Sequence, residues 1–347
     1  MMEKRREAER MKAAVFEGKG DLRIVELPRP VPGKGEVLVQ VMACGVCGTD
    51  VHIYHGDEGA AKTPAGTVLG HEFAGIVVEV GPGAEGVSVG DRVCVDPNKL
   101  CGSCPQCLGG KGHFCENMVG IGTTVHGGFA QYCAVPASQV YEIAEGTTYE
   151  MAAMTEPLAC CLHGIDMCGI VPGDTVAVIG GGMIGQLMVQ LSRLSGAAKV
   201  TLIEPVESKR QQALTLGADV CIDPLTEDMA AAGGANVVIE CVGKPATMAQ
   251  AIAIAGQKAT VMLFGLTAPA EELTVRPFEM FKKELTIKTS YINPYTQSRA
   301  LSLIDAGRVD VTSCVAACRP LEDLPQVLAD PALRRDGKVI ICPWMEG

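Results

Sequence analysis

The sequence has 347 residues, a formal net charge of −11 at pH 7 and 16 cysteines. Its length allows two domains with separate cores, and its acidic excess argues against nucleic acid and anionic membranes as partners. Cysteines in a long chain without a secretory signal indicate thiols and metal ligands in a reducing compartment, not a disulfide framework. No apolar run approaches the ~20 residues that a membrane helix needs. We therefore expect a soluble, cytoplasmic protein.

The N-terminal part of the chain predicts strands and turns. Residues 1–10 are charged and lack the hydrophobic segment of a signal peptide, and Met11 is an equally suitable natural start. Beyond it, the runs Val37–Val41 and Gly75–Val80 are rich in β-forming residues and are bounded by Pro-Gly and Gly-Pro-Gly clusters. An all-β module therefore comes first, and the run Gly127–Val135 is expected to return to strand.

Two groups of potential metal ligands lie within this module. They are Cys44-Gly-Val-Cys47-Gly-Thr49-Asp50-Val-His52 and Gly70-His71-Glu72. A Cys-x-x-Cys pair alone fits a redox pair as well as half of a structural zinc site. His71, taken alone, fits a satisfied buried histidine better than a ligand. Their interpretation depends on the rest of the chain.

Four cysteines follow within a short, glycine-rich stretch. They are Cys101, Cys104, Cys107 and Cys115. This spacing lets four thiolates converge on one ion, and a closed tetrahedral thiolate shell is typical of structural zinc. An iron–sulfur cluster uses similar spacings, but nothing nearby indicates electron transfer. We expect a structural zinc site.

The region after Pro172-Gly173 alternates strands and helices. Its expected strands are residues 175–179, 200–203, 220–222, 237–240, 260–264 and 285–288. A helical segment from Ser208 to Leu216 stops at Gly217, a good C-cap residue. Such alternation predicts a doubly wound parallel sheet that binds its ligands at the carboxyl ends of the strands.

A glycine-rich turn joins the first of these strands to a helix. It reads Gly180-Gly181-Gly182-Met183-Ile184-Gly185 and fills the G-x-G-x-x-G pattern. The first glycine makes the turn, the second lets a pyrophosphate approach the backbone, and the third allows close helix packing. The second strand ends in Glu204, where an acidic side chain holds the ribose hydroxyls. Strand, turn, helix and acid together predict a dinucleotide site.

The C-terminal part is expected to return to the first domain. After Pro294, a helical pattern covers residues 298–306 and a last strand covers Lys338–Cys342. We therefore expect a catalytic domain of residues 1–157 and 295–347, with residues 158–294 inserted as the dinucleotide-binding domain.

The order of these parts resembles the zinc-dependent medium-chain alcohol and polyol dehydrogenases, from Met11 to the end. The matching motifs are Cys47-Gly-Thr-Asp, Gly70-His-Glu, Cys101/104/107/115, Glu156-Pro-Leu-Ala, the turn at 180–185 and Lys338-Val-Ile-Ile. The resemblance implies an α/β protein with a β-rich GroES-like catalytic domain and a Rossmann domain. It also implies two zinc ions per chain, with the catalytic one in the cleft between the domains.

The resemblance assigns ligands to the catalytic zinc. It makes Cys47 and His71 ligands, and places Glu72 at the metal as an exchangeable ligand. Where liver-type alcohol dehydrogenases use a second cysteine, the polyol-like branch carries a glutamate at or near the metal, here Glu156. Cys160 and Cys161 are the nearest alternative thiolates. Such a site keeps an open position for an alcohol oxygen.

The resemblance also implies the remaining roles. Zinc lowers the pKa of the substrate hydroxyl, and NAD accepts the hydride. Thr49 and His52 match the family's proton relay. Met183, Ile184, Lys209 and Lys338 join the glycines and Glu204 as cofactor-binding residues. Glu204 favours NAD over NADP, whereas Lys209 and Arg210 lean toward NADP.

The substrate is expected to be a polyol or sugar alcohol. Glu156 and the run Ser290-Tyr-Ile-Asn-Pro294 resemble the polyol branch, although sorbitol dehydrogenases of animal type carry arginine at the position of Ser290. The alternative is L-threonine, because residues 47–54 also resemble threonine dehydrogenases. Those enzymes carry Asp-Pro where this chain has Glu156-Pro157.

Two other classes of protein compete with this prediction. Some zinc-free relatives act as quinone reductases, lens proteins or binding proteins, but here both sets of zinc-site residues are complete. A redox switch would need Cys44 and Cys47 as free thiols. We expect the substrate to be a small-molecule alcohol. We also expect a homodimer or homotetramer, because both assemblies are common among similar proteins.

Overall fold

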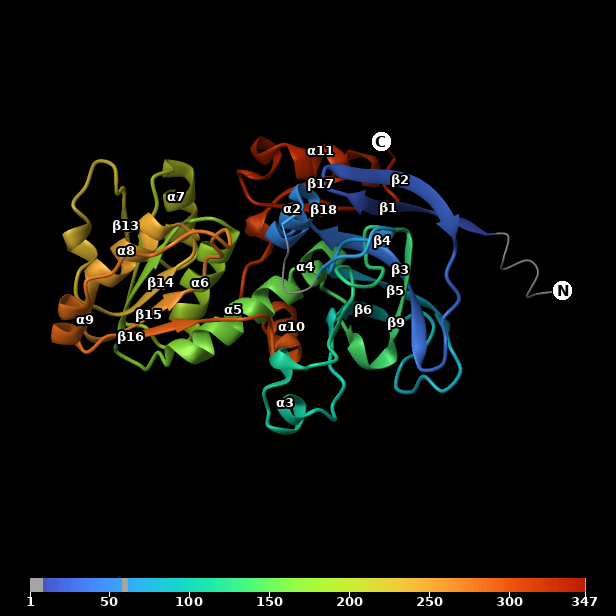
Figure 1. Ribbon diagram of the computed structural model, residues 1–347, viewed down its shortest axis with the longest axis horizontal. Coiled ribbons are helices and arrows are strands. Elements are labelled where there is room, and N and C mark those ends of the chain that lie inside the picture. Colours follow the sequence, from blue (N-terminus) through green and yellow to red (C-terminus); the bar gives the residue numbers. More distant parts are fainter. Residues whose placement is uncertain (1–8, 58–61, 347) are drawn as a thin grey trace. The chain divides into compact units, whose positions relative to one another are not determined.

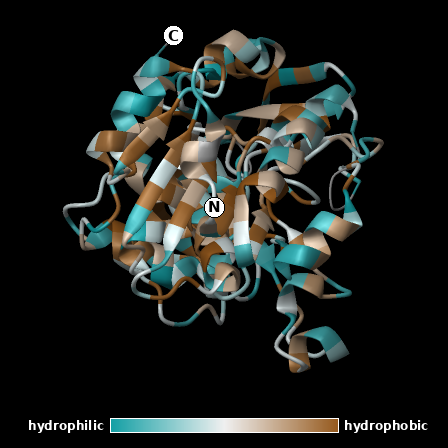
Figure 2. Cartoon of the chain, turned by 90° about the vertical axis from the view of Figure 1, so that its left-hand side faces the viewer, coloured by the Kyte–Doolittle hydropathy of each residue, from teal (hydrophilic) through white to brown (hydrophobic). Residues whose placement is uncertain are grey.

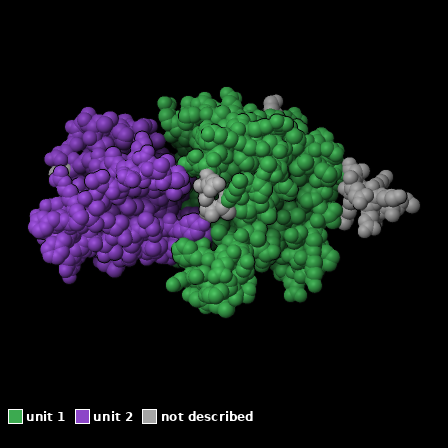
Figure 3. Space-filling model, viewed as in Figure 1, with its two compact units in different colours: residues 1–157, 297–347 green, residues 158–296 purple. Residues whose placement is uncertain are grey.

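The computed structural model describes residues 9–57 and 62–346. Residues 1–8, and with them the choice between Met1 and Met11 as the start, lie outside the described part. The chain forms two compact units, one built from the residues up to 157 and from 297 onward, the other from residues 158–296 (Figure 3). The second change of unit lies two residues beyond the position expected from the sequence.

The first unit is rich in strands (Figure 1). Its strands are β1 (Arg10–Gly18), β2 (Asp21–Pro28), β3 (Glu36–Gly45), β4 (Thr67–Val68), β5 (Glu72–Val80), β6 (Arg92–Val95), β7 (Asn98–Lys99), β8 (Val119–Gly120), β9 (Tyr132–Pro136), β10 (Val140–Glu142), β17 (Val315–Arg319) and β18 (Lys338–Ile341). Its helices are α2 (Gly48–His55), α3 (Pro105–Leu108), α4 (Tyr149–Ala153), α10 (Gln297–Asp305) and α11 (Leu324–Ala329).

The largest sheet of this unit joins both ends of the chain. Its strand order is β10-β6-β5-β3-β18-β17, with β9 also paired to β3. The C-terminal strand β18 pairs antiparallel with β3, so the predicted return of the chain to the first domain is confirmed (Figure 1). The core between the elements buries large side chains such as Phe73 and Phe129 completely.

One expected strand is shorter than predicted. Residues 127–135 read as strand, but the structure begins β9 only at Tyr132. Gly128 lies against the ring of Phe73, where a Cβ would come within 2.5 Å. The N–H groups of Gly127 and Phe129 donate to Val68 O and Leu69 O. This close backbone packing replaces a regular ladder.

The second unit is a helix–sheet structure. The helix α5 (Thr155–Cys168) begins at the end of the first unit and leads into it. Its further elements are β11 (Thr175–Ile179), α6 (Met183–Leu194), β12 (Lys199–Ile203), α7 (Glu207–Thr215), β13 (Val220–Ile222), β14 (Ala235–Glu240), α8 (Pro245–Ile254), β15 (Ala255–Leu263), α9 (Pro277–Lys283) and β16 (Thr286–Thr289).

The sheet of the second unit confirms the predicted doubly wound topology. Its six strands run in the order β13-β12-β11-β14-β15-β16, and all neighbouring pairs are parallel. The order reverses at β11, so the carboxyl end of β11 is the switch point where such sheets bind ligands. Figure 2 shows hydrophobic colour concentrated on sheet strands and hydrophilic colour on outer helices and loops. Among the described residues, no helix is both long and apolar enough to span a bilayer.

Candidate functional site

Cys47 lies at the junction of β3 and α2. It is the N-cap of α2, with extended backbone angles (φ −100°, ψ 158°). Asp50, which is fully buried, accepts a hydrogen bond from the Cys47 N–H through Oδ2 at 2.9 Å. This bond satisfies one of the N–H groups that a helix start leaves unpaired. The thiol of Cys47 is thereby held at a fixed position at the start of the helix.

His71 follows a glycine that no other residue could replace without strain. Gly70 has φ +95°, and a Cβ there would lie 2.7 Å from Cys44 Sγ and 2.8 Å from Phe129 N. His71 is buried, and its Nδ1 lies 3.4 Å from Asp50 Oδ1. Neither atom has another partner among the described residues. Asp50 therefore orients the imidazole so that Nε2 is left for a metal, as carboxylate–histidine pairs do in zinc sites.

Glu72 forms a buried ion pair with Lys338. Lys338 Nζ donates to Glu72 Oε1 at 2.8 Å and Oε2 at 2.6 Å, and to Val46 O at 3.1 Å. The two side chains are 3% and 1% exposed. Burial is the largest single effect and lowers the pKa of Lys338, but the charges of Glu72, Cys47 and Glu156 and the hydrogen bonds to Glu72 together raise it above the ordinary lysine value. That Lys338 contacts the cofactor stays a prediction, since its described contacts are these three.

Cys47, His71 and Glu72 form a group of potential metal ligands. Their ligand atoms all lie within 4.8 Å of one another. Burial alone would lower the pKa of His71, but Asp50 and Cys47 raise it well above its usual value. The group thus places negative charge around an imidazole. A ligand set of one thiolate, one imidazole and one carboxylate fits zinc.

Glu156 lies near this group without belonging to it. It is buried, in the first turn of α5, and its charge contributes to the raised pKa of Lys338. Among the described residues, the three-ligand group above does not include Glu156, Cys160 or Cys161. The assignment of Glu156 as the third ligand therefore stays a prediction.

Thr49 and His52 occupy one face of α2. They are three residues apart on this helix, so their side chains are neighbours. His52 Nδ1 lies 3.0 Å from Asp57 Oδ2, and the His52 side chain is 37% exposed. His52 therefore reaches water, as the outer member of a proton relay must.

The alternative redox pair is disfavoured by the environment of Cys44. This thiol is fully buried. Burial, followed by the charges of Asp50 and Glu72, raises its pKa well above the ordinary value. A buried, protonated thiol is a poor reagent for disulfide exchange.

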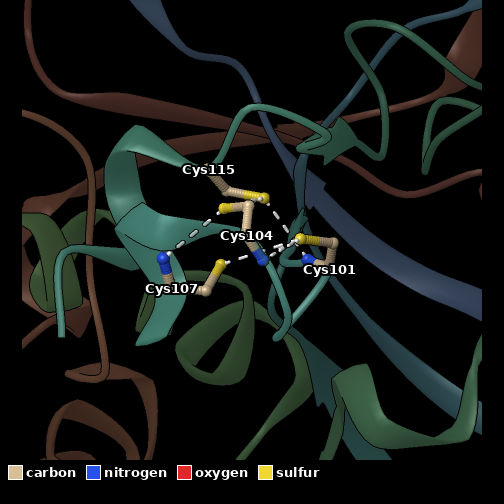
Figure 4. Close-up of side chains that lie close together, drawn as sticks. All are labelled: Cys101, Cys104, Cys107 and Cys115. Carbon is tan, nitrogen blue, oxygen red and sulfur yellow. Dashed lines mark hydrogen bonds between the residues drawn. The ribbon is translucent and has the colours of Figure 1, made fainter. Parts of the chain in front are cut away.

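The four expected zinc cysteines converge in one lobe (Figure 4). Cys101 Sγ lies 4.0 Å from Cys107 Sγ, and Cys104 Sγ lies 4.0 Å from Cys115 Sγ. Zn–S bonds of about 2.3 Å in a tetrahedron place sulfur atoms about 3.8 Å apart. The spacing fits one zinc ion and is about twice a disulfide bond of roughly 2.05 Å.

Backbone groups of the same lobe stabilise thiolates. Cys104 N–H donates to Cys101 Sγ at 3.3 Å, and Cys107 N–H donates to Cys104 Sγ at 3.5 Å. Hydrogen bonds from Ser103 and Cys104 lower the pKa of Cys101 to about 5. The lobe is closed at its base by the two-residue pairing of β7 and β8. The lobe has little secondary structure of its own, so a bound zinc ion would be its main stabilising element.

The glycine turn of the second unit has the geometry its motif requires. Gly180 has φ +97°, and a Cβ at Gly185 would overlap Gly180 O. A Cβ at Gly182 would meet no atom within 4 Å, so the space beside it is open. The first N–H groups of α6, at Met183, Ile184 and Gly185, have no partner within the helix. The turn therefore fits a pyrophosphate.

Glu204 closes this turn from the neighbouring strand. It is buried at the end of β12, and it accepts hydrogen bonds from Gly181 N–H at 2.6 Å and Val206 N–H at 2.9 Å. The Arg210 side chain is held by the backbone, because its guanidinium donates hydrogen bonds to Glu204 O and Pro205 O, both at 2.8 Å. A carboxylate offers about four acceptor positions, so about two remain for ribose hydroxyls.

Comparison with known proteins decides the family. Residues 33–145 match the family model of the alcohol dehydrogenase GroES-like domain, and residues 183–306 match that of the zinc-binding dehydrogenases. D-arabinitol dehydrogenase 1 of Uromyces fabae is 32% identical over 343 residues, which cover 96% of this chain and 97% of the relative. This chain belongs to the zinc-dependent medium-chain dehydrogenases. It is an enzyme of the zinc-dependent alcohol and polyol dehydrogenase kind.

This dehydrogenase is similar to further enzymes. L-threonine 3-dehydrogenase of Pyrococcus furiosus is 34% identical over 300 residues, which cover 83% of this chain and 85% of that protein. The crystal structure of a putative zinc-binding dehydrogenase from Sinorhizobium meliloti 1021, bound to NADP, aligns with a TM-score of 0.92 at 39% identity. It covers 96% of this chain and 100% of that chain.

The sequence did not reveal every contact in the site of this dehydrogenase. Asp50 was visible only as part of the Cys47 motif, although the structure places it against both Cys47 and His71. The ion pair of Lys338 with Glu72 joins residues 266 positions apart. The available sequence signal for Asp50 was an acidic residue three positions after Cys47, because that spacing suits a helix cap.

Proposed function

We propose that this dehydrogenase oxidises a secondary alcohol of a small polar molecule to the ketone, with zinc and NAD. The observation that carries this proposal is the group of Cys47, His71 and Glu72, whose ligand atoms lie within 4.8 Å of one another. Of this group, Cys47 directly precedes the helix α2, which carries Thr49 and His52. A metal-ligand set beside hydroxyl and imidazole groups supports alcohol chemistry.

The residues of the chain hold and orient the ligand set. When bound there, zinc would supply Lewis-acid polarisation of the alcohol oxygen. Asp50 fixes the Cys47 backbone and faces His71 Nδ1, which sets the tautomer of the imidazole. Lys338 holds the Glu72 carboxylate by both oxygens. This pairing competes with a metal for the Glu72 carboxylate, which suits an exchangeable ligand, and Glu156 is proposed as the resting ligand from the resemblance of the Glu156-Pro157 motif.

Thr49 and His52 provide a route for the proton. The Thr49 hydroxyl both accepts and donates a hydrogen bond, so it can pass a proton outward without a lasting charge. His52 lies one turn further along α2, is partly exposed and pairs with Asp57 at 3.0 Å. Asp57 holds the ring in place through Nδ1, and the exposed His52 side chain can pass a proton to water.

NAD is the proposed cofactor. The open space at Gly182 and the start of α6 suit a pyrophosphate, and Glu204 lies beside the turn with its carboxylate buried. A carboxylate accepts hydrogen bonds from ribose hydroxyls and repels a 2′-phosphate. The nicotinamide would accept the hydride. Arg210 is engaged by backbone carbonyls, which weakens the case for NADP that its position suggested.

A polyol or sugar alcohol is the proposed substrate class. The Glu156-Pro157 motif and the similarity to D-arabinitol dehydrogenase 1 over nearly the whole of both chains support it. L-threonine is the second candidate, because L-threonine 3-dehydrogenase of Pyrococcus furiosus is 34% identical over 83% of this chain. None of the 16 cysteines forms a disulfide in the structure, which supports a reducing compartment such as the cytoplasm.

A substrate screen tests the proposal. The purified, zinc-loaded enzyme is offered sugar alcohols, vicinal diols and L-threonine with NAD, and reduced nicotinamide is followed by absorbance. We expect turnover of one or more polyols, and its loss in Cys47→Ser. Turnover of threonine with no activity on any polyol would overturn the substrate class. Full activity of Cys47→Ser would overturn the proposed site.

A further inference from the structure

A third group of potential metal ligands lies outside both sites described above. It consists of Glu150, Cys318 and Cys342, and their ligand atoms all lie within 4.8 Å of one another. Glu150 lies in the first turn of α4, Cys318 in β17, and Cys342 directly after β18. Their positions in the sequence are so far apart that no spacing motif joins them.

The backbone holds the two thiols in fixed relation. β17 and β18 are parallel neighbours in which Cys318 is paired with Ile340, so Cys342 lies two residues further along the same face. The Cys342 N–H donates to Arg319 O at 2.8 Å, which continues the ladder past the end of β18. The group therefore rests on a sheet and not on a loose loop.

The group is open to solvent on one side. β17 is the edge strand of its sheet, and Cys318 is exposed while Cys342 is half-buried. An ion from solution can reach the thiols without any part of the fold opening. The proposed reaction does not use these residues, and neither of the two other zinc groups includes them.

We propose that Glu150, Cys318 and Cys342 form a third zinc site, with two thiolates and one carboxylate as ligands and water in the fourth position. Borderline-soft zinc accepts mixed sulfur and oxygen ligands, whereas magnesium and calcium require oxygen shells. In a tetrahedral zinc shell the sulfur atoms lie about 3.8 Å apart, so rotation of side chains suffices to close the observed group.

The electrostatics of the group support a cation. Burial, and then the charge of Glu150, raises the pKa of Cys318. Burial, Cys318 and Glu150 together raise the pKa of Cys342 to about 12. The negative charge of Glu150 beside both thiols disfavours their ionisation when no cation is bound. Zinc reverses this balance, and its binding releases two protons as both Zn–S bonds form.

A disulfide between Cys318 and Cys342 is the competing use of the pair. It would leave the carboxylate of Glu150 without a role and beside two sulfur atoms. Protonated thiols are also poor nucleophiles toward a disulfide or a peroxide. The three-ligand arrangement therefore favours metal over oxidation.

The test counts zinc bound by the full-length enzyme. Wild type and variants are equilibrated with excess zinc, desalted and analysed by mass spectrometry of the metal. We expect three zinc ions per chain in wild type, two in Cys318→Ser, and three in the control Cys221→Ser, which removes a half-buried thiol of the other unit. Turnover should be unchanged in Cys318→Ser. Cobalt added to the enzyme with two zinc ions should give a thiolate charge-transfer band that Cys318→Ser lacks.

Two results would overturn the proposal. One is a wild-type enzyme that holds only two zinc ions under these conditions. The other is a Cys318→Ser variant that still binds three. If wild type holds two ions and loses two thiols to hydrogen peroxide, with water as the other product, the pair is a disulfide switch and not a metal site. The number of zinc ions bound per chain does not depend on the substrate, so a failed substrate screen would not change the outcome of this test.

Discussion

Lys338 Nζ donates to both carboxylate oxygens of Glu72, at 2.8 and 2.6 Å, although the two residues are 266 positions apart in the chain. Both side chains are almost completely buried. A buried carboxylate without its partner is strongly unfavourable, while removal of both charges is far less so. The pair therefore links the C-terminal strand to the candidate metal site.

We expect Lys338→Met to lower the free energy of unfolding by about 3–5 kcal/mol, because Glu72 is left buried and unpaired. The double variant Lys338→Met with Glu72→Gln should recover most of that loss. Urea unfolding of the two single variants, the double variant and wild type measures the coupling. Equal losses in Lys338→Met and in the double variant would show that the ion pair is not the source of the effect.

Asp50→Asn should lower the zinc affinity of the candidate catalytic site by about 10–100-fold, because carboxylates that orient a ligand imidazole contribute this much. The asparagine oxygen still accepts the Cys47 N–H bond, so the start of α2 is kept. Asp50→Ala removes that bond as well and should also lower the melting temperature. Competition with a chelator measures zinc affinity. Unchanged affinity in Asp50→Asn would show that the 3.4 Å approach to His71 has no role in binding.

Glu156→Gln should leave the fold intact and lower kcat/KM by about 100-fold or more, since it changes a proposed ligand and not only a supporting group. The control is Glu145→Gln, whose side chain is exposed. Circular dichroism confirms folding, and metal content is measured in parallel. A Glu156→Gln enzyme with full activity and full zinc content would exclude Glu156 as the third ligand.

Cys107→Ser should release one zinc ion and loosen the lobe between β7 and β8, because structural zinc supplies its folding energy directly. We expect rapid cleavage by trypsin at Lys111, within that lobe. The control Cys221→Ser should keep its zinc and resist cleavage. Protection of the lobe in zinc-depleted Cys107→Ser would show that β7 and β8 hold it without a metal.

Wild type should have a higher kcat/KM with NAD than with NADP. In Glu204→Gln, the ratio of kcat/KM with NAD to kcat/KM with NADP should fall by about 10-fold or more. The amide keeps the bond from Gly181 but no longer repels a 2′-phosphate. Glu207→Gln is the control, because Glu207 is an exposed carboxylate on the following helix. Comparable efficiency with both cofactors in wild type would mean that Lys209 and Arg210 outweigh Glu204.

The sequence predicted the features that follow from local pattern. The parallel sheet, its six strands and the turn at Gly180 could be read because strand–turn–helix units have short-range signatures. The convergence of Cys101 with Cys115 could be read because their spacing is characteristic of one ion. Each of these depends on residues that are close in the chain.

Contacts between distant residues could not be read in this way. Nothing in the sequence places Lys338 beside Glu72, or Glu150 beside Cys318 and Cys342, because these contacts arise from strand order in the assembled sheet. The start of β9 was missed for a related reason. Gly128 packs on Phe73, a residue of another strand, and tertiary packing overrides the local strand pattern.

The eight-residue helix α2 has a consequence for how the site moves. Its cap residue is the proposed ligand Cys47, and its first two turns carry Thr49 and His52. A rigid tilt or slide of this helix moves ligand and relay together and leaves the distances between them unchanged. Residues 47–55 therefore form one rigid structural unit. In protein engineering, they should be exchanged between relatives as a block, since single changes would separate parts that the helix keeps in register.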